Sequence, residues 1–565
     1  MHLMRLLVLL AFILLLWMPD RASSRPKDII VTVVDHWEPR TGWWYEDALP
    51  SWSECYPQFA DRHRDSDGKP LQHSWFFWNC SDWRYWTMPD SGQIHSLLDL
   101  AFRGYGEIDL HVHHEENGDQ LSNYSSFQTN MRSFIRTMRQ YGVAITAEEH
   151  PRTRFGFIHG MWALDNSYYC DESNSGNPTH RFCGVNQELR ALNELGCFAD
   201  FTLPSWGVMD SYLIKNQCFY VRDDDRAKSY GNPRNACVAE VHGRQDGDLL
   251  LFAGPYWPRP STQILDNLVP ASFDAWVSCN VHVKGNDDWV FVKLHTHGLE
   301  QARLVSRDEK AEGTSALWGD IADLFWNYVE TRYNDGTRYR LHYVTAREAY
   351  NILRAAEAGL KGNPNLYRDF EIPPYAHTRL HVSCRYRLES WTEKVVVFSL
   401  RQAVSRVFAD MHVGDREVVA EEFSKEKGWS YSDALFTSVS GDVRLDDQTP
   451  SESYRLTFLS RADRHASGSS AANVAVAITG VSPNPSHGDP IAFRLALRRN
   501  QPVSLEVFNV LGQLVRTLVE CNGERSTQVM WDGRDRDGRL VPTGVYVCRV
   551  STPEWSCFTR VTILR

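Results

Sequence analysis

The sequence predicts a multi-domain protein in which an α/β domain is followed by a small β-rich domain and a C-terminal β-sandwich. The chain has 565 residues, more than one ordinary domain usually holds. Short apolar strands alternate with amphipathic helices up to about residue 360, which is typical of parallel strands wrapped by helices in a barrel or an open sheet. Beyond that point strand-like segments dominate, with closely spaced turns in the last part.

The elements of the α/β domain follow one another in a regular order. Apolar runs predict strands over 29–34, 108–112, 144–146, 198–203 and 339–344. Periodic apolar residues predict a helix that ends at Gly142, with one face formed by Phe127, Met131, Phe134, Ile135 and Met138. Further helices are expected at Leu189, Leu192 and Leu195, at Leu317, Ile321, Leu324, Phe325 and Tyr328, and over 346–358.

Changes in composition divide the chain. We expect a signal peptide over 1–24, the α/β domain over 25–365, a β-rich accessory domain over 371–460, a linker over 461–473 and the sandwich over 474–565. Segments 380–382, 395–400 and 454–459 have strand character, and residues 466–470 read Ala-Ser-Gly-Ser-Ser, as in a flexible linker.

The N-terminus predicts export. Arg5 precedes the apolar run 6–17, and the small residues Ala22 and Ser24 precede Arg25. The apolar run is too short to span a bilayer comfortably, so we interpret it as a cleavable signal peptide. No later segment has 18 uninterrupted apolar residues. We therefore expect an extracellular or cell-surface protein without a transmembrane anchor in its mature chain.

Export makes disulfides feasible for the 12 cysteines. The candidate pairs are Cys170/Cys183, then Cys55/Cys80 and Cys218/Cys237. A zinc knuckle of Cys170, His180 and Cys183 is an alternative, although no fourth ligand is evident.

The net charge of −11 does not favour nucleic acid. The 20 Trp suit either large cores or a carbohydrate cleft, because the indole ring stacks on sugars.

Histidines gather where the strand over 108–112 ends. His111 and His113 share a face with Asp109, and His114 can turn inward beyond the strand. Carboxylate and imidazole together are a usual ligand set for zinc or a similar divalent ion. The strand over 29–34 delivers Asp35 to its C-terminal end. Active sites on such scaffolds gather at the C-terminal ends of the strands. We therefore predict that this histidine cluster binds a divalent metal ion; a polar strand end with hydrogen-bonded histidines is the alternative.

Two further segments carry candidate catalytic residues. Residues 157–166 bring His159 and Asp165, and the strand-like segment 291–298 ends in His295 and His297. A histidine at such a position can protonate a leaving group or bind metal. For each of these histidines, a satisfied structural histidine is the alternative.

In their order, these motifs resemble the polysaccharide-deacetylase (NodB-homology) family over roughly residues 28–300. Val33-Val34-Asp35, Glu107-Ile108-Asp109-Leu110-His111 and Lys293-Leu294-His295 occupy the places of its acidic, paired-histidine and Leu-His motifs. The resemblance implies a barrel-like α/β domain of the deacetylase or glycosidase type and metal-assisted removal of acetyl groups from a glycan, with zinc as the expected cofactor.

The chain departs from that family in two places. Val34-Asp35-His36 stands where two adjacent aspartates are usual, and Glu115 stands where the second histidine is usual. His113 or His114 would replace that histidine. The resemblance thus implies a metal core of Asp35, His111, His113 and His114. The catalytic residues that it implies are Glu38, Asp165, His295 and His297, with Glu38, Asp165 or a further residue not identified in the sequence as the base.

The last part of the chain contains four motifs, which are Pro483-Asn484-Pro485, Val503 to Asn509, Trp531-Asp532-Gly533 and Gly544-Val545-Tyr546. In these motifs it resembles the FlgD-type immunoglobulin-like domain and the C-terminal sorting domains of type IX secretion. The resemblance implies sorting or surface attachment through secretion or cell-surface machinery; a plain spacer is the alternative.

Two other functions remain open. One is a glycoside hydrolase on the same type of barrel, with Glu38 and Asp165 as its carboxylate pair. The other is a non-catalytic surface glycan-binding protein with a degenerate site.

Overall fold

The structure is a computed structural model, and it describes residues 25–38, 48–78, 91–113, 124–148, 151–169, 185–203, 214–256, 269–299, 318–384, 386–392, 395–412, 417–425, 428–432, 435–437, 442–459, 476–483, 486–497, 501–509, 513–523, 526–551 and 556–564. The expected signal peptide and linker, His114 and the Cys170/Cys183 pair lie outside these residues. The chain forms two compact units, the first ending at Thr378 and the second beginning at Arg379.

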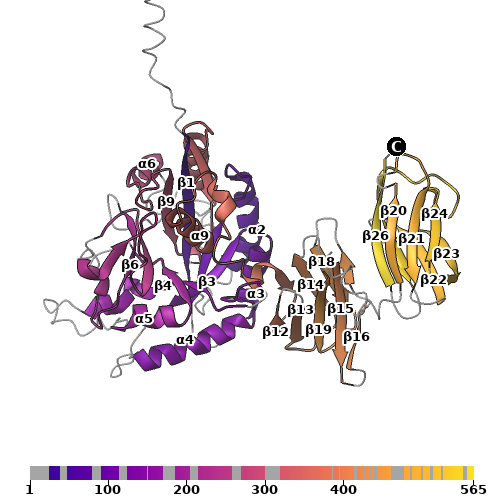
Figure 1. The fold of residues 1–565 in the computed structure, drawn as a ribbon, viewed down its shortest axis with the longest axis horizontal. Coiled ribbons are helices and arrows are strands. Elements are labelled where there is room, and N and C mark those ends of the chain that lie inside the picture. The colour runs from indigo at the N-terminus through magenta and orange to yellow at the C-terminus, as the bar shows by residue number, and fades with distance from the viewer. Residues whose placement is uncertain are drawn as a thin grey trace, which may run out of the picture. The chain divides into compact units, whose positions relative to one another are not determined.

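The first unit is built on one mixed sheet (Figure 1). Its strands are β1 (Lys27–Trp37), β2 (His73–Trp78), β3 (Gly106–Val112), β4 (Phe155–His159), β5 (Cys197–Asp200), β6 (Gln217–Val221), β7 (Ala236–Val238), β8 (Leu249–Ala253), β9 (Trp289–Thr296) and β10 (Tyr339–Tyr343). The order is β10-β1-β2-β3-β4-β5-β8-β6-β7, and β9 also pairs with β1. All pairs are parallel except those of β6 with β7 and β8.

Strand β1 is the centre of this arrangement. Its first half pairs with β10 over Lys27–Val31 and its second half with β2 over Val33–Trp37. Strand β9 pairs with β1 along Asp28–Asp35 and therefore lies along the edge of β1 opposite to that taken by β10 and β2. Among the described residues no strand pairing joins the two ends of this path, so the expected barrel is not shown.

Alternating side chains of the strands supply two hydrophobic cores, one on each face of the sheet. Val33 and Trp37 belong to one core and Val34 to the other. Helices flank the sheet (Figure 1). They are α2 (Ala48–Arg62), α3 (Ser91–Phe102), α4 (Tyr124–Arg139), α5 (Glu188–Glu194), α6 (Pro270–Ser278), α8 (Asp320–Tyr333) and α9 (Ala346–Glu357).

The helix predictions succeed to different degrees. Helix α4 buries the five residues expected from its periodicity. Helix α8 does not follow its expected face, because Leu324 is 70% exposed and the buried residues are Ala322, Phe325, Trp326, Val329 and Tyr333. The buried stripe of α8 lies about one position further along the chain than expected, because the large side chains of Phe325 and Trp326 determine which face of the helix packs.

Two strand expectations change as well. Residues Ile145 and Thr146 form only isolated bridges, because Ala144 adopts a left-handed conformation with φ 55° that interrupts an extended strand. The strand expected over 198–203 ends at Asp200. At the end of this unit, the Arg347 guanidinium donates to the Ile372 carbonyl at 2.7 Å, so the segment after α9 packs with the first unit.

The second unit consists of small antiparallel sheets. Residues 379–459 form β11 (Leu380–Val382), β12 (Tyr386–Trp391), β13 (Val395–Leu400), β14 (Val407–His412), β15 (Glu417–Ser424), β16 (Gly428–Tyr431), β17 (Leu435–Thr437), β18 (Asp442–Asp447) and β19 (Ser453–Leu459). Their sheets run β11-β14-β18-β17 and β12-β13-β19-β15-β16.

The last part adds β20 (Val476–Ser482), β21 (Ile491–Leu497), β22 (Gln501–Phe508), β23 (Leu514–Gly523), β24 (Ser526–Trp531), β25 (Gly544–Ser551) and β26 (Ser556–Ile563). They form the sheets β20-β21-β24 and β23-β22-β25-β26. The sequence motifs supply their shared core, since Trp531 is fully buried and its ring lies 5.4 Å from that of Tyr546.

The expected Cys218–Cys237 disulfide is not formed. Both thiols are free, because the antiparallel pairing of β6 with β7 places Cys237 opposite Tyr220. Cys55 is free as well. Among the described residues no helix is both long enough and apolar enough to cross a membrane.

Candidate metal centre

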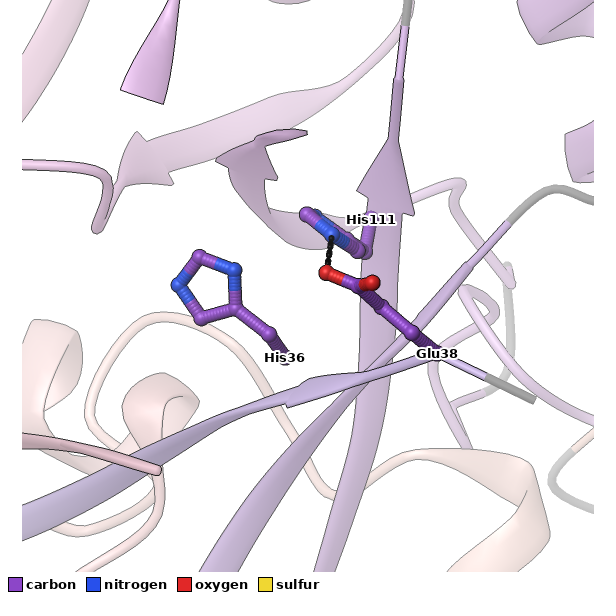
Figure 2. Close-up of side chains that lie close together, drawn as sticks. All are labelled: His36, Glu38 and His111. Carbon is purple, nitrogen blue, oxygen red and sulfur yellow. Dashed lines mark hydrogen bonds and ion pairs between the residues drawn. The ribbon is translucent and has the colours of Figure 1, made fainter. Parts of the chain in front are cut away.

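The candidate site lies where β1 and β3 end. Residues of β1 alternate between the faces of the sheet, so His36 follows Val34 onto one face while Asp35 points to the other. On β3, His111 and His113 share a face because they are two residues apart. Figure 2 shows His36 and Glu38 from the end of β1 and His111 from β3 pointing into the same space.

Three ligand atoms converge there. The Nε2 of His111 lies 3.3 Å from the Oε1 of Glu38, and the Nε2 of His113 lies 3.2 Å from that oxygen. The two Nε2 atoms are 3.1 Å apart. His36, Glu38 and His111 also each offer one ligand atom within 4.8 Å of the others.

The backbone fixes which nitrogen of His111 faces this cluster. Nδ1 of His111 lies 2.8 Å from the carbonyl oxygen of Ile158, and a carbonyl can only accept, so Nδ1 carries the proton. In the neutral imidazole Nε2 is then an acceptor. The ring is fully buried, and an Nδ1–H bond to a carbonyl is the usual way in which a metal-binding histidine is oriented.

Burial and neighbouring charges determine the protonation of these groups. Burial lowers the pKa of His111 below its usual value despite the opposing contacts with Glu38. Burial and the nearby imidazoles of His297 and His111 lower the pKa of His36 well below its usual value. Burial would raise the pKa of Glu38, but the neighbouring imidazoles of His113 and His111 hold it well below its usual value. The carboxylate is thus ionised.

This geometry fits a divalent metal. Zinc binds imidazole nitrogen and carboxylate oxygen at about 2.0–2.2 Å, so two tetrahedral ligands are separated by roughly 3.3 Å. The spacings of 3.1–3.3 Å among His111, His113 and Glu38 agree with that value. The Nε2 of His36 is buried without a hydrogen-bond partner among the described residues, and it is available as a further ligand.

Neighbouring residues determine the position of the His113 ring. A side-chain carbon added to Gly160 would lie 2.3 Å from the His113 Cγ, so only glycine leaves room for this ring. On another side the ring of Trp78 lies 4.6 Å from that of His113. Gly160 directly follows β4, whose Ile158 also orients His111. Strand β4 thus helps to place both histidines.

The structure also brings His295 and His297 to this site. The ring centroid of His36 lies 5.8 Å from that of His295 and 4.6 Å from that of His297. Trp162, whose ring lies 6.1 Å from that of His36, is an aromatic neighbour. Both strand-end histidines expected on β9 therefore lie in the histidine cluster.

The structure does not bring Asp35 into the ligand group. Its carboxylate accepts hydrogen bonds from the Thr296 hydroxyl and the Gly298 backbone, on the other face of β1. Burial raises its pKa to about 7. Asp109, on the same face as His111, accepts instead from the Gly156 N–H and the Tyr375 hydroxyl, both at 2.7 Å.

Asp165 has separate surroundings. It is fully buried, and its carboxylate accepts from the Ser229 N–H at 2.6 Å. Its own N–H donates to Glu188 at 2.7 Å, and Glu188 lies 3.4 Å from the Nε2 of His159. These contacts anchor the loop after β4. They give Asp165 no described contact with the histidine cluster.

The site residues expected from the sequence include Glu38 as a catalytic residue but do not include His36. The signal was present in the alternation of β1, since Val34, His36 and Glu38 share one parity. Asp35, the aspartate of the expected motif, has the opposite orientation on β1. A second group, Asp65, Asp67 and His342, was also missed; there the Asp67 carboxylate lies 2.8 Å from the Nδ1 of His342.

Comparisons with known proteins do not assign a family. No family model and no curated protein matches the chain. Among solved structures, PorZ of Porphyromonas gingivalis, described as a surface component of the type-IX secretion system, is 23% identical over 24% of this chain and 15% of its own, with a TM-score of 0.14.

FlgD from P. aeruginosa is 18% identical over 16% of this chain and 68% of its own, with a TM-score of 0.12. Latent PorU from Porphyromonas gingivalis is 14% identical over 41% and 23%, with a TM-score of 0.16. The chain thus spans less than a quarter of PorZ and PorU.

Proposed function

We propose that this protein is an exported, metal-dependent hydrolase that removes acetyl groups from a glycan. The observation that carries the proposal is the triangle of His111 Nε2, His113 Nε2 and Glu38 Oε1, with sides of 3.1–3.3 Å. Because the Nδ1–H of His111 donates to the Ile158 carbonyl, the Nε2 of His111 and the Oε1 of Glu38 are both acceptors, and they face each other. A positive charge between them removes the repulsion, and the buried His111 disfavours a proton.

Two imidazoles and one carboxylate would hold the ion, which we expect to be zinc. Such ligand sets leave positions open for water and substrate. When bound, the ion supplies a Lewis acid that polarises a carbonyl and lowers the pKa of water. In this proposal Glu38 is the carboxylate ligand in place of Asp35, and His111 and His113 are the paired histidines.

Residues around the triangle would assist the reaction. His295 and His297 lie beside His36, and in this proposal they give a proton to the departing amine or alkoxide. Trp162 offers an aromatic face near the same rings, which suits a sugar. The two-carboxylate glycosidase is less well supported, because Asp165 is fully buried and bound to Ser229 and Glu188.

The ends of the chain support the exported location. Residues 1–24 have the composition of a signal peptide. The last domain buries Trp531 and Tyr546 of its motifs in one core, as expected for the sorting-type domain that its sequence resembles. We propose that this domain serves in secretion or surface attachment.

Acetate release tests the activity. Protein purified without chelator is incubated with an N-acetylated chitooligosaccharide and with an O-acetylated xylan oligosaccharide. We expect acetate from one of them, and a loss of at least 100-fold in His111→Ala. His282→Ala, a histidine of the same unit that pairs with Asp287, is the control and keeps wild-type activity. New reducing ends without acetate would contradict the proposal and favour a glycosidase.

A further inference from the structure

The carboxylate of Asp35 connects the ends of β1 and β9. Asp35 is fully buried and lies opposite Thr296 in the parallel register of the two strands. Its Oδ2 accepts from the Thr296 hydroxyl, and it also accepts a hydrogen bond from the Gly298 backbone. One side chain of β1 thus binds two alternate residues at the end of β9.

The same segment is fixed from other directions. A side-chain carbon on Gly298 would lie 2.5 Å from the Asp35 Oδ2 and 2.5 Å from the Trp52 ring. The Trp52 indole donates to the Gly298 carbonyl at 3.1 Å. Because Gly298 has no room to move toward either neighbour, the backbone beyond β9 is confined.

His295 and His297 are the residues that flank Thr296. Since side chains alternate along an extended chain, both project away from Asp35, toward the His36 ring at 5.8 and 4.6 Å between centroids. A hydrogen bond on one face of the sheet therefore determines where two imidazoles lie on the other face.

We propose that Asp35 is a positioning residue that holds His295 and His297 at the metal centre by binding Thr296 and Gly298. The effect on turnover rests on the proposed function, since it requires these histidines to act on substrate. Asp35 itself touches neither the ion nor the substrate. This positioning role differs from the role of metal ligand or general base that the sequence motif suggests for an aspartate directly after the first strand.

Four variants separate these roles. Asp35→Ala removes both hydrogen bonds, and Thr296→Val removes one of them with an isosteric side chain. Asp35→Asn retains one oxygen that can accept from both donors. Asp28→Asn is the matched control, because Asp28 is a buried carboxylate of the same strand, roughly 23 Å away at about 3.3 Å per residue. Zinc content, kcat and KM are measured for each.

A chemical readout is independent of activity. Diethyl pyrocarbonate modifies accessible histidines, and the tryptic peptide 294–303 contains His295 and His297 as its only histidines. Peptide 104–132, with the His111 cluster, is the internal reference. We expect modification of peptide 294–303 to be at least threefold faster in Asp35→Ala and Thr296→Val, and unchanged in Asp35→Asn and Asp28→Asn.

In the kinetic arm, kcat should fall at least tenfold in Asp35→Ala and Thr296→Val with KM and zinc content unchanged. Asp35→Asn should stay within threefold of wild type. Wild-type modification rates in Thr296→Val, or an Asp35→Asn variant as impaired as Asp35→Ala, would overturn the inference. If the wild-type protein releases no acetate, the proposed function fails, and the peptide rates alone decide the role of Asp35.

Discussion

Glu38 and His111 are 73 residues apart in the sequence, yet the Oε1 of one lies 3.3 Å from the Nε2 of the other. The contact is made because β1 and β3 both pair with β2 in parallel, which brings their carboxyl ends to one edge of the sheet. The Ile158 carbonyl then leaves His111 with an acceptor nitrogen toward Glu38. Two buried acceptors that face each other lack a donor between them, and a bound cation would satisfy both.

The choice between Glu38 and Asp35 as the carboxylate ligand is directly testable. Glu38→Gln should weaken zinc binding on the order of 100-fold, because the amide oxygen is a neutral and poorer ligand than the carboxylate. Asp35→Asn should bind zinc within threefold of wild type, since Asp35 points to the other face of β1. Competition with a chromophoric chelator gives both constants, and the reverse ranking would return Asp35 to the ligand set.

Gly160 should be required for the metal centre. Gly160→Ala places a carbon 2.3 Å from the His113 ring, so the ring must move away from Glu38 and His111. We expect at least tenfold weaker zinc binding. Gly544→Ala, whose added carbon meets nothing closer than 4.0 Å, is the control. Unchanged zinc affinity in Gly160→Ala would show that His113 is not a ligand.

Lys293 should stabilise the first unit. Its buried ammonium donates to the carbonyls of Phe201, Leu203 and Phe252, which ties β9 to the ends of β5 and β8. Lys293→Met leaves three carbonyls without this donor and should lower the free energy of unfolding by about 3 kcal/mol or more.

Urea unfolding of the full chain, followed by tryptophan fluorescence, measures the effect of Lys293→Met. The control is Lys284→Met, which removes a lysine whose side chain is 67% exposed. Its first transition should match that of wild type within about 0.5 kcal/mol. Equal midpoints for the two variants would contradict a stabilising role for Lys293.

His342 should make the stability of the first unit depend on pH. Its Nε2 lies 2.8 Å from Asp28 and its Nδ1 2.8 Å from Asp67. Burial lowers the pKa of His342, but the two carboxylates outweigh it and the net pKa is raised. The contribution is therefore complete below the unfolded pKa of about 6.5 and is lost as pH rises through the higher folded value.

Wild type and His342→Gln should thus differ most in unfolding free energy at pH 5.5 and least at pH 9. Urea titrations at both values check this, with His282→Gln as the control because His282 is paired outside the network, with Asp287. A difference that grows with pH would mean that His342 is neutral in the folded protein.

Periodicity predicted the elements well where one face alone is buried. Helix α4 has one apolar stripe, and its five residues could be identified from the sequence. Helix α8 has apolar residues on several sides, so Leu324 was assigned to the core although Trp326 and Val329 occupy it. Which stripe packs depends on the partner surface, which local sequence does not contain.

The sequence could indicate which strand ends gather at the site, but not the role of each side chain there. His111, His113, His295 and His297 lie together, because parallel strands deliver their carboxyl ends to one edge. The place of Asp35 in a motif predicts it as a ligand, whereas the alternation of β1 puts His36 and Glu38, and not Asp35, on the face of the histidine cluster. The bond from Asp35 to Thr296 joins strands 261 residues apart, which no local pattern encodes.

Zinc-edge X-ray absorption on protein purified without chelator tests the central claim most directly. The account predicts about one equivalent of metal, with a first shell of nitrogen and oxygen at about 2.0–2.2 Å and outer-shell scattering from two imidazoles. The Glu38→Gln and His111→Ala variants should lose it. Less than a tenth of an equivalent after zinc addition, or sulfur scattering at about 2.3 Å, would contradict the metal centre of Glu38, His111 and His113.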